Sequence, residues 1–191
     1  MARERKFSTD ELFQATKQLL LLQGYEGFTF SLLADDLNVS RGALYKYFDN
    51  KEELITDYML YEMDRFLIEL KQIESHRSFE AQFDYLLSLI LSNTDIQKLI
   101  NIGKQIQVGS NQKVKENKHK LEKLHIDMYH YLQNFITLGK EEQRLKSHIP
   151  DSLFLGYIFQ SVAIPNHFGI SPSVWVSSIK EIIRHGMFTN T

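Results

Sequence analysis

The chain has 191 residues and a net charge of −2, and 43% of its residues are hydrophobic, which suffices for a sizeable core. Because it has no cysteine, a disulfide framework, a cysteine-ligated metal and a cysteine nucleophile are excluded. The longest apolar run, Leu19–Leu22, is far shorter than the about 20 residues that span a bilayer. The charged start, Met1–Ser8, lacks the apolar segment of a secretory signal, so we expect a cytoplasmic protein with no membrane partner.

Two helix signals open the chain. Ser8 and Glu11 have the spacing of a capping box, and apolar residues then recur at helical intervals until Gly24 and Gly27. A second, short helix is predicted over Thr29–Leu37, because its first residue is a good N-cap and its apolar residues form one stripe.

A tight turn and two more helices are predicted next. Asn38 tolerates the left-handed backbone that such a turn often needs. Ser40 is expected to cap a third helix, Arg41–Tyr47, and Asn50 is expected to cap a fourth that reaches about residue 74. Acidic residues around Asn50 favour a helix start through the macrodipole.

The remainder of the chain also has helical periodicity. Proline is absent before residue 150, so long helices are permitted there. No strand-like alternation and no internal repeat stands out, and the predicted fold class is all-α. Five more helices are predicted, at Phe79–Leu91, Ile96–Val108, Lys113–Leu138, Ser152–Ile164 and Val174–Phe188, with a polar connection at Gly139–His148.

The strongest functional signal lies in residues 29–48, which read TFSLLADDLNVSRGALYKYF. A helix, a tight turn and a second helix at this spacing indicate a helix-turn-helix. In such a motif the first helix crosses the DNA backbone and the second lies in the major groove. The motif therefore predicts that double-stranded DNA is a partner of this chain.

The residue types at the start of the second helix suit contact with DNA. Gly42 and Ala43 keep its bulk low, so that it can approach the bases. Arg41 can donate to guanine or to phosphate, and Lys46 can pair with phosphate or with a base edge. The full set of candidate DNA-binding residues is Thr29, Ser40, Arg41, Gly42, Ala43, Tyr45, Lys46, Tyr47 and Lys51.

Several of these candidates also have a purely structural interpretation. Thr29 and Ser40 are expected as helix caps, with or without a phosphate contact. Tyr45 and Tyr47 either reach phosphate with their hydroxyls or pack on the fourth helix. Lys51 lies near a helix N-terminus, where backbone N–H groups also attract phosphate.

The N-terminal part of the chain that contains the helix-turn-helix is called the head below. Its other residues are expected to form its hydrophobic core or an N-terminal tail. Leu44 and Phe48 are expected in the hydrophobic core of the head rather than on DNA. Arg3, Arg5 and Lys6 form either a solvated tail or an arm that contacts the minor groove. Residues 1–55 hold seven Lys and Arg against nine Asp and Glu, so any attraction to DNA must come from the face that meets phosphate.

The head closely resembles the DNA-binding signature of the TetR family. The resemblance covers about residues 8–55, and its C-terminal support is weaker. Three positions depart from the family pattern: Asn38 stands where the family usually has Gly, Arg41 where Lys is common and Ala43 where Thr is common. The resemblance rests on Thr29, Leu33-Ala34, Val39–Phe48 and Lys51–Leu54, with weaker support from Gly139–Leu145 and Ile183–Met187.

This resemblance implies a homodimer with two helix-turn-helix heads. Residues 1–50 would be the DNA-binding domain, and residues 51–191 would bind a ligand and form the dimer. The last two long helices of each subunit would build a four-helix interface, and an effector in the C-terminal domain would move the heads through the fourth helix. The expected function is repression at a palindromic operator, released by a small molecule; the alternative is control by a protein partner instead.

No enzymatic chemistry is predicted. No nucleophile with a placed base and no glycine-rich phosphate loop is present. His125 and His130 are five residues apart, which does not place both on one helix face. We therefore expect no catalytic residue, no metal site and no cofactor, while the residues that would line an effector pocket stay undetermined.

Overall fold

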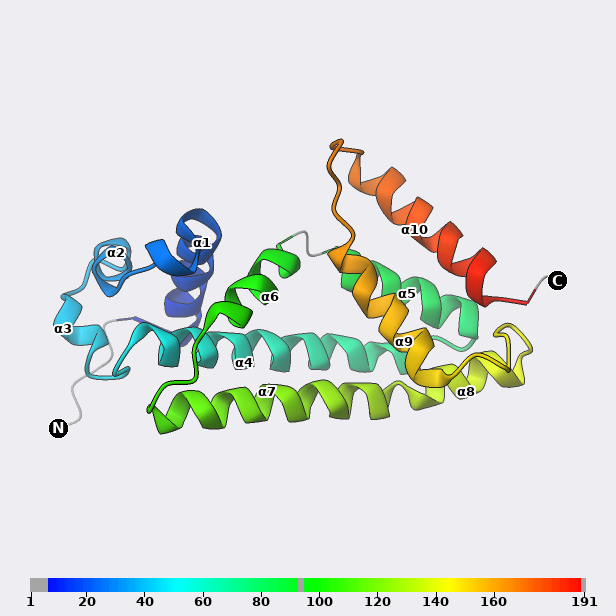
Figure 1. Ribbon diagram of the computed structural model, residues 1–191, viewed down its shortest axis with the longest axis horizontal. Helices are drawn as coiled ribbons and strands as arrows, with labels where there is room; N and C mark the ends of the chain where they lie inside the picture. The colour runs from blue at the N-terminus through cyan, green and yellow to red at the C-terminus, as the bar shows by residue number, and fades with distance from the viewer. Residues whose placement is uncertain (1–6, 93–94, 190–191) are drawn as a thin grey trace. The chain divides into compact units, whose positions relative to one another are not determined.

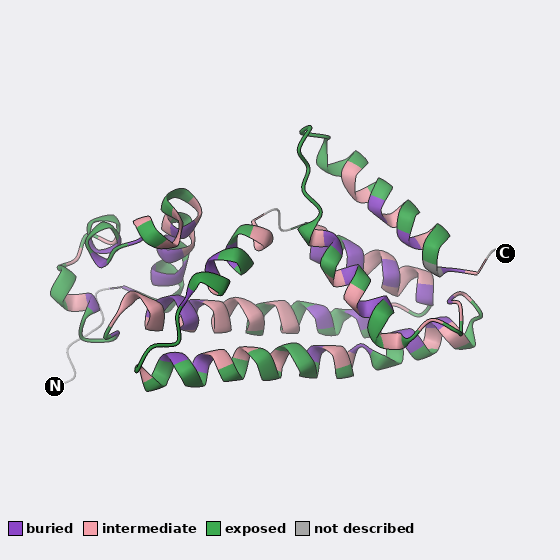
Figure 2. Ribbon diagram, viewed as in Figure 1, coloured by how far each residue is buried: buried purple, intermediate pink, exposed green. Residues whose placement is uncertain are grey.

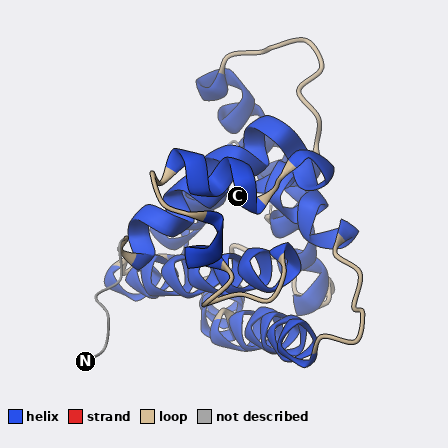
Figure 3. Cartoon of the chain, turned by 90° about the vertical axis from the view of Figure 1, so that its left-hand side faces the viewer, coloured by secondary structure: helices blue, strands red, loops and turns tan. Residues whose placement is uncertain are grey.

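The structure, a computed structural model, describes residues 7–92 and 95–189, and within this part of the chain the secondary structure is helical (Figures 1 and 3). The prediction of an all-α fold is confirmed; one isolated bridge pairs Leu145 with Phe188. No helix among these residues is long and apolar enough to cross a membrane. The elements are α1 (Thr9–Gly27), α2 (Phe30–Asp36), α3 (Arg41–Leu44), α4 (Lys51–Leu70), η1 (Lys71–Ser75), α5 (Phe79–Leu91), α6 (Ile96–Gln105), α7 (Gln112–Tyr131), α8 (Gln133–Glu141), α9 (Asp151–Gln160), η2 (Ser161–Ala163) and α10 (Pro172–Met187).

The described chain divides into two compact units. Unit 1 takes in residues up to Asp64 together with Asp95–Lys123, and unit 2 takes in Arg65–Thr94 together with the chain from Leu124 onward. Helices α4 and α7 each contribute to both units. Unit 1 thus extends beyond residue 50, where we expected the DNA-binding domain to end; the functional boundary itself stays a prediction.

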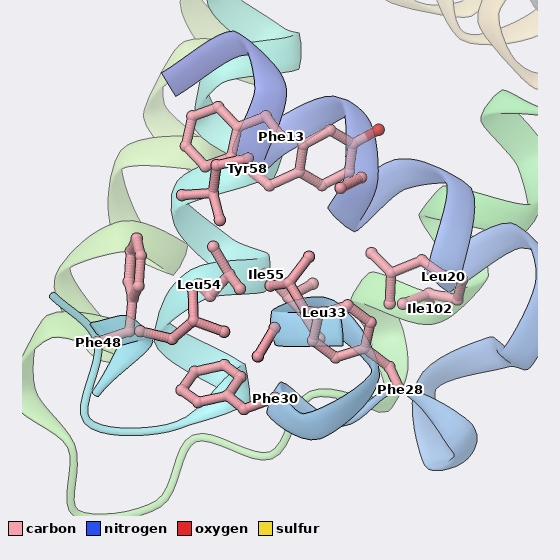
Figure 4. Close-up of a cluster of buried hydrophobic side chains, with 14 of the residues drawn as sticks. Phe13, Leu20, Phe28, Phe30, Leu33, Phe48, Leu54, Ile55, Tyr58 and Ile102 are labelled. Atoms are coloured by element: carbon pink, nitrogen blue, oxygen red, sulfur yellow. The ribbon is translucent and has the colours of Figure 1, made fainter. Parts of the chain in front are cut away.

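Apolar side chains from α1, α2, α3, α4 and α6 fill the core of unit 1 (Figure 4). Leu33, Leu44 and Leu54 are fully buried there, and Phe48 joins the same cluster. The assignment of Leu44 and Phe48 to the core is confirmed. Ile102 of α6 packs in this cluster as well, so a helix far along the chain completes the hydrophobic core of the head.

The helix starts of unit 1 follow local capping chemistry. Ser8 and Glu11 form the expected capping box: the Glu11 N–H donates to Ser8 Oγ (3.1 Å), and the Ser8 N–H donates to the Glu11 carboxylate (2.7 Å). The Leu32 N–H donates to Thr29 Oγ1 at 3.3 Å, and the Glu53 N–H donates to Asn50 Oδ1 at 2.8 Å. These three predicted caps are confirmed.

The third helix differs from its prediction. Ser40 occupies the N-cap position of α3, but its side chain makes no capping hydrogen bond. The α-helix ends at Leu44 instead of Tyr47, and a turn continues the chain to residue 47. The Tyr47 and Phe48 N–H groups both donate to the Leu44 carbonyl, which tightens this turn and directs Phe48 into the core.

Three later boundaries were also predicted wrongly. Helix α6 ends at Gln105 instead of Val108, because Ile106 adopts an extended backbone and buries its side chain. The long helix expected at 113–138 is divided at Leu132 into α7 and α8. Helix α8 then runs through Gly139 to Glu141, where a polar connection was expected.

Unit 2 has an aromatic core. The rings of Phe79 and Phe135 stack with centroids 4.9 Å apart, and Phe188 packs on Phe83 at the same separation. Gly139 is needed against this cluster, since a Cβ there would lie 2.6 Å from the Phe79 ring. Gly139 is accordingly a buried residue of α8.

Ion pairs fasten α10 to α5 at the rim of this core. Glu80 accepts hydrogen bonds from Arg144 (2.7 Å) and Arg184 (3.0 Å), and Asp84 accepts one from Lys180 (3.1 Å). These side chains are partly exposed, so the pairs orient the helices more than they stabilise the fold. Figure 2 shows the buried residues of α5 and the more exposed surface of α10.

Candidate DNA-binding interface

The turn between α2 and α3 is rigidly built. Asn38 has a φ of 50°, the left-handed backbone predicted for it. The Val39 N–H donates to the Ala34 carbonyl at 2.9 Å, and the Leu37 N–H donates to the Leu33 carbonyl at 3.0 Å. Because the apolar side chains on both sides of the turn are buried, α2 and α3 hold one fixed geometry.

The first turn of α3 presents Arg41 to solvent beside an aromatic support. Arg41 Nη2 lies 3.4 Å from the Tyr45 hydroxyl, and its guanidinium carbon is 5.3 Å from the Tyr45 ring centroid. Tyr45 in turn packs edge-on against the buried Phe30 ring at 4.9 Å and stays 47% exposed. Tyr45 therefore orients Arg41 and still offers its hydroxyl to a phosphate.

Gly42 is exposed at the start of α3. A Cβ built at this residue meets nothing within 4 Å, and its φ is not in the left-handed range. Neither packing nor backbone geometry within the chain therefore requires glycine here. Close approach of an outside molecule to the α3 backbone would explain the residue, as the sequence predicted.

The remaining candidates differ in their exposure and in their contacts within the protein. Lys46 is exposed, and Ala43 is half-buried. Tyr47 packs its ring against Phe7 at a centroid distance of 5.9 Å. Ser40 is exposed, with its hydroxyl not used as a cap. Thr29 is exposed too, but its hydroxyl already caps α2.

Lys51 has a structural role that the sequence did not reveal. Its ammonium donates to the Tyr25 carbonyl (2.8 Å) and lies 4.2 Å from the Tyr25 ring centroid. The Tyr25 hydroxyl donates to Glu52 at 2.7 Å. The pKa of Tyr25 is raised mainly by burial and secondly by this hydrogen bond. Lys51 and Glu52 thus fasten the end of α1 to the start of α4; a phosphate contact by Lys51 stays a prediction.

All nine candidates lie in unit 1. Arg3, Arg5 and Lys6, considered for a minor-groove arm, lie outside the described residues. Tyr25 and Glu52 were missed, because the hydrogen bonds of Tyr25 with Lys51 and with Glu52 join positions 26 and 27 residues apart and have no local pattern. Among residues 7–92 and 95–189, no group of three or more His, Cys, Asp or Glu side chains is arranged to hold a metal ion.

Residues 12–58 match the family described as bacterial regulatory proteins, tetR family. This N-terminal region therefore resembles the DNA-binding region of the TetR family. The match spans most of α1, the helix-turn-helix and the first turns of α4, which are the elements that build the exposed face of α3. The TetR signature thus coincides with the geometry described above.

A curated relative is similar to this chain over about half of its length. An HTH-type transcriptional regulator of Staphylococcus aureus (strain USA300) is 25% identical over 108 residues, 54% of this chain. The aligned stretch spans 58% of that relative's own length. The similarity of this chain to that regulator therefore extends over about half of each protein.

Solved structures share the fold along nearly the whole chain. The ketosteroid transcriptional regulator KstR2 of Mycobacterium tuberculosis superposes with a TM-score of 0.72 and 15% identity, covering 100% of this chain and 98% of its own. The regulator FadR from Bacillus subtilis, in complex with stearoyl-CoA, has a TM-score of 0.70 and 17% identity, with 94% and 99% covered. At such identities the likeness shows the fold alone.

Proposed function

We propose that this chain is a DNA-binding transcriptional repressor that occupies a palindromic operator as a homodimer. The observation that carries the proposal is the surface formed by α3 and the turn after it, where Arg41, Gly42 and Lys46 are all exposed on a well-packed helix-turn-helix. The TetR-family match over this region supports it. A role on the chromosome also agrees with the expected cytoplasmic location.

Apolar side chains on α9 and α10 support the proposed homodimer. Leu153 and Tyr157 of α9, and Val174 and Ile182 of α10, are all exposed large hydrophobic residues. A surface of this kind is typical of a protein interface. Two α3 helices in such a dimer would enter successive major grooves if the half-site centres lie about 34–36 Å apart.

A hollow in unit 2 supports the proposed small-molecule effector. Its volume is about 410 Å³, within the range of ligand pockets. Apolar Ile73 and Phe135 form part of its lining, and Tyr131, Thr137 and Glu141 add polar groups. Any effector must bind the DNA-free form more tightly, because equal affinity for both forms shifts nothing.

The first test selects bound sequences from a random duplex pool at two salt concentrations. We expect a palindrome whose affinity weakens as salt rises, because phosphate contacts release counterions. The variant Arg41→Ala/Lys46→Ala should lose operator binding and remain dimeric. Lys98→Ala/Lys104→Ala is the matched control, since both lysines are exposed on α6 of unit 1 and the charge change is the same.

The two variants distinguish specific contacts made by α3 from a general effect of net charge on DNA affinity. Equal loss of binding in both would show that only net charge matters, and unchanged affinity in Arg41→Ala/Lys46→Ala would contradict the assignment of α3. No enriched sequence from a folded dimer would overturn the proposed operator binding.

A further inference from the structure

The buried stripe of α7 is interrupted by one amide side chain. Val114 and Met128 are buried on this stripe, as their helical spacing predicts. Asn117 occupies the same stripe and has no exposed surface. A buried amide among apolar positions requires an explanation, because burying a polar group costs free energy unless it is hydrogen-bonded.

The Asn117 amide binds two side chains on the facing turn of α4. Its Nδ2 donates to Thr56 Oγ1 at 3.0 Å and to Asp57 Oδ1 at 2.6 Å. The Thr56 hydroxyl donates to the carbonyl of Glu52 in its own helix at 2.9 Å, so its oxygen is left to accept from α7. Lys113 Nζ lies 3.7 Å from the same Asp57 oxygen.

The other end of the Asn117 amide is not satisfied. Its Oδ1 is buried and accepts no hydrogen bond from any described residue. A leucine would fill similar space without an unpaired oxygen, so this amide does not optimise stability. Buried polar residues at helix interfaces are best known for fixing one register between the helices at some cost in stability.

Only one register of α7 on α4 satisfies these hydrogen bonds. A shift of α7 by one helical turn would place Val114 or Leu121 opposite Thr56 and leave the Asp57 carboxylate without its amide donor. Lys118 fixes the same region from the other side, since its Nζ donates to the carbonyl of Ile106 at 2.5 Å.

The turn of α4 that Asn117 contacts is packed against the helix-turn-helix. Leu54 and Ile55, which directly precede Thr56, are fully buried in the core of unit 1 with Leu33 (Figure 4), and Leu44 belongs to the same cluster. A change in the register of α7 therefore acts on the base of the DNA-binding head.

We propose that Asn117 is a positioning residue that fixes the register of α7 against the first turns of α4 and so holds the helix-turn-helix in one position. The consequence for DNA rests on the operator binding proposed above, but the positioning itself does not. Replacing the amide should leave a folded protein whose head occupies more than one position relative to α7.

The first experiment measures a distance distribution between two spin labels in the full chain. The absence of native cysteine lets Ser31→Cys on α2 and Lys120→Cys on α7, both exposed, be labelled specifically. We expect one narrow distance population with Asn117, and a shifted or broadened population in Asn117→Leu.

Val114→Ala is the matched control, because Val114 lies on the same face of α7, is equally buried and forms no side-chain hydrogen bond. It should lower the unfolding temperature and leave the distance unchanged. Equal broadening in both variants, or an unchanged distance in Asn117→Leu, would overturn the proposal. If Asn117→Leu does not fold, Thr56→Val removes the same acceptor and is judged by the same criterion.

The second experiment measures affinity for the selected operator and for duplexes with one base pair added to or removed from its centre. If the fraction of dimers with both heads correctly held falls to a third, the apparent Kd rises about threefold at the native spacing. The preference for that spacing should weaken in Asn117→Leu and persist in Val114→Ala; a preference kept in both would overturn the proposed effect on DNA. Should the parent protein bind no duplex, the proposed repressor function fails, and the distance measurement still decides the role of Asn117.

Discussion

Replacing Gly42 with alanine should stabilise the chain and weaken its binding to DNA. The new methyl meets no atom of the protein within 4 Å, and alanine forms helices more readily than glycine by about 0.5–1 kcal/mol. For a domain of this size, that gain raises the unfolding temperature by roughly 1–4 °C. If the same methyl prevents one base contact worth about 1 kcal/mol or more in each half-site, the Kd of the dimer rises about 30-fold or more.

Thermal unfolding and operator titration at fixed salt measure the two effects. Gly109→Ala is the control, since Gly109 is also exposed with open space at its Cβ, but lies in the loop between α6 and α7. It should leave the affinity for the operator unchanged. Tight operator binding by Gly42→Ala would refute the conclusion that DNA approaches the backbone of α3 at this residue.

Three predictions concern unit 2. Gly139→Ala should lower the free energy of unfolding by about 1–3 kcal/mol, because its Cβ would meet the Phe79 ring at 2.6 Å; chemical denaturation measures this. Arg184→Met should cost less than about 1 kcal/mol, since its ion pairs are partly exposed, and the difference should shrink in high salt. The hydrogen bond from Lys140 lowers the pKa of Asp151 below its usual 3.8. The stability that ionised Asp151 adds to the folded state is therefore fully present above pH 3.8 and is lost as pH falls through the lowered pKa. Asp151→Asn should therefore flatten the acid limb of a stability curve measured against pH.

Each of these three predictions has an outcome that contradicts it. Gly156 is the control for Gly139, because a Cβ at that helical glycine meets nothing within 4 Å; equal losses in both would show that the Phe79 contact is not responsible. A large loss in Arg184→Met that persists in high salt would show that packing on Phe83 matters more than charge. Identical acid limbs for Asp151→Asn and the parent would refute the role of the Lys140 hydrogen bond.

Local chemistry explains why much of the head could be predicted from the sequence. The capping box of Ser8 and Glu11, the cap at Thr29 and the left-handed turn at Asn38 each depend on residues within four positions of one another. The apolar stripe that places Leu33 in the core has the same short period. Interactions of this range can be recognised from the order of residues alone, and they set the helix starts and the turn of the helix-turn-helix.

The features that could not be predicted depend on partners distant in sequence. Ile102 joins the core of the head across more than 40 residues, and Lys51 binds the carbonyl of Tyr25. The division of the long helix at Leu132 and the burial of Gly139 follow from contacts with other helices. Such contacts between distant residues leave no periodicity and no capping pattern in the sequence.

The charge of the head limits how DNA can be bound. Residues 1–55 have more acidic than basic side chains, so no broad positive field attracts the duplex. Asp36 and Glu11 line a hollow between α1 and the end of α2, whereas Arg41 and Lys46 belong to α3 and the turn after it. Affinity must therefore come from a few well-placed contacts and not from general attraction to phosphate. Because such contacts require an accurately held helix, the proposed operator binding should be sensitive to groups that position the head as well as to those that would touch DNA.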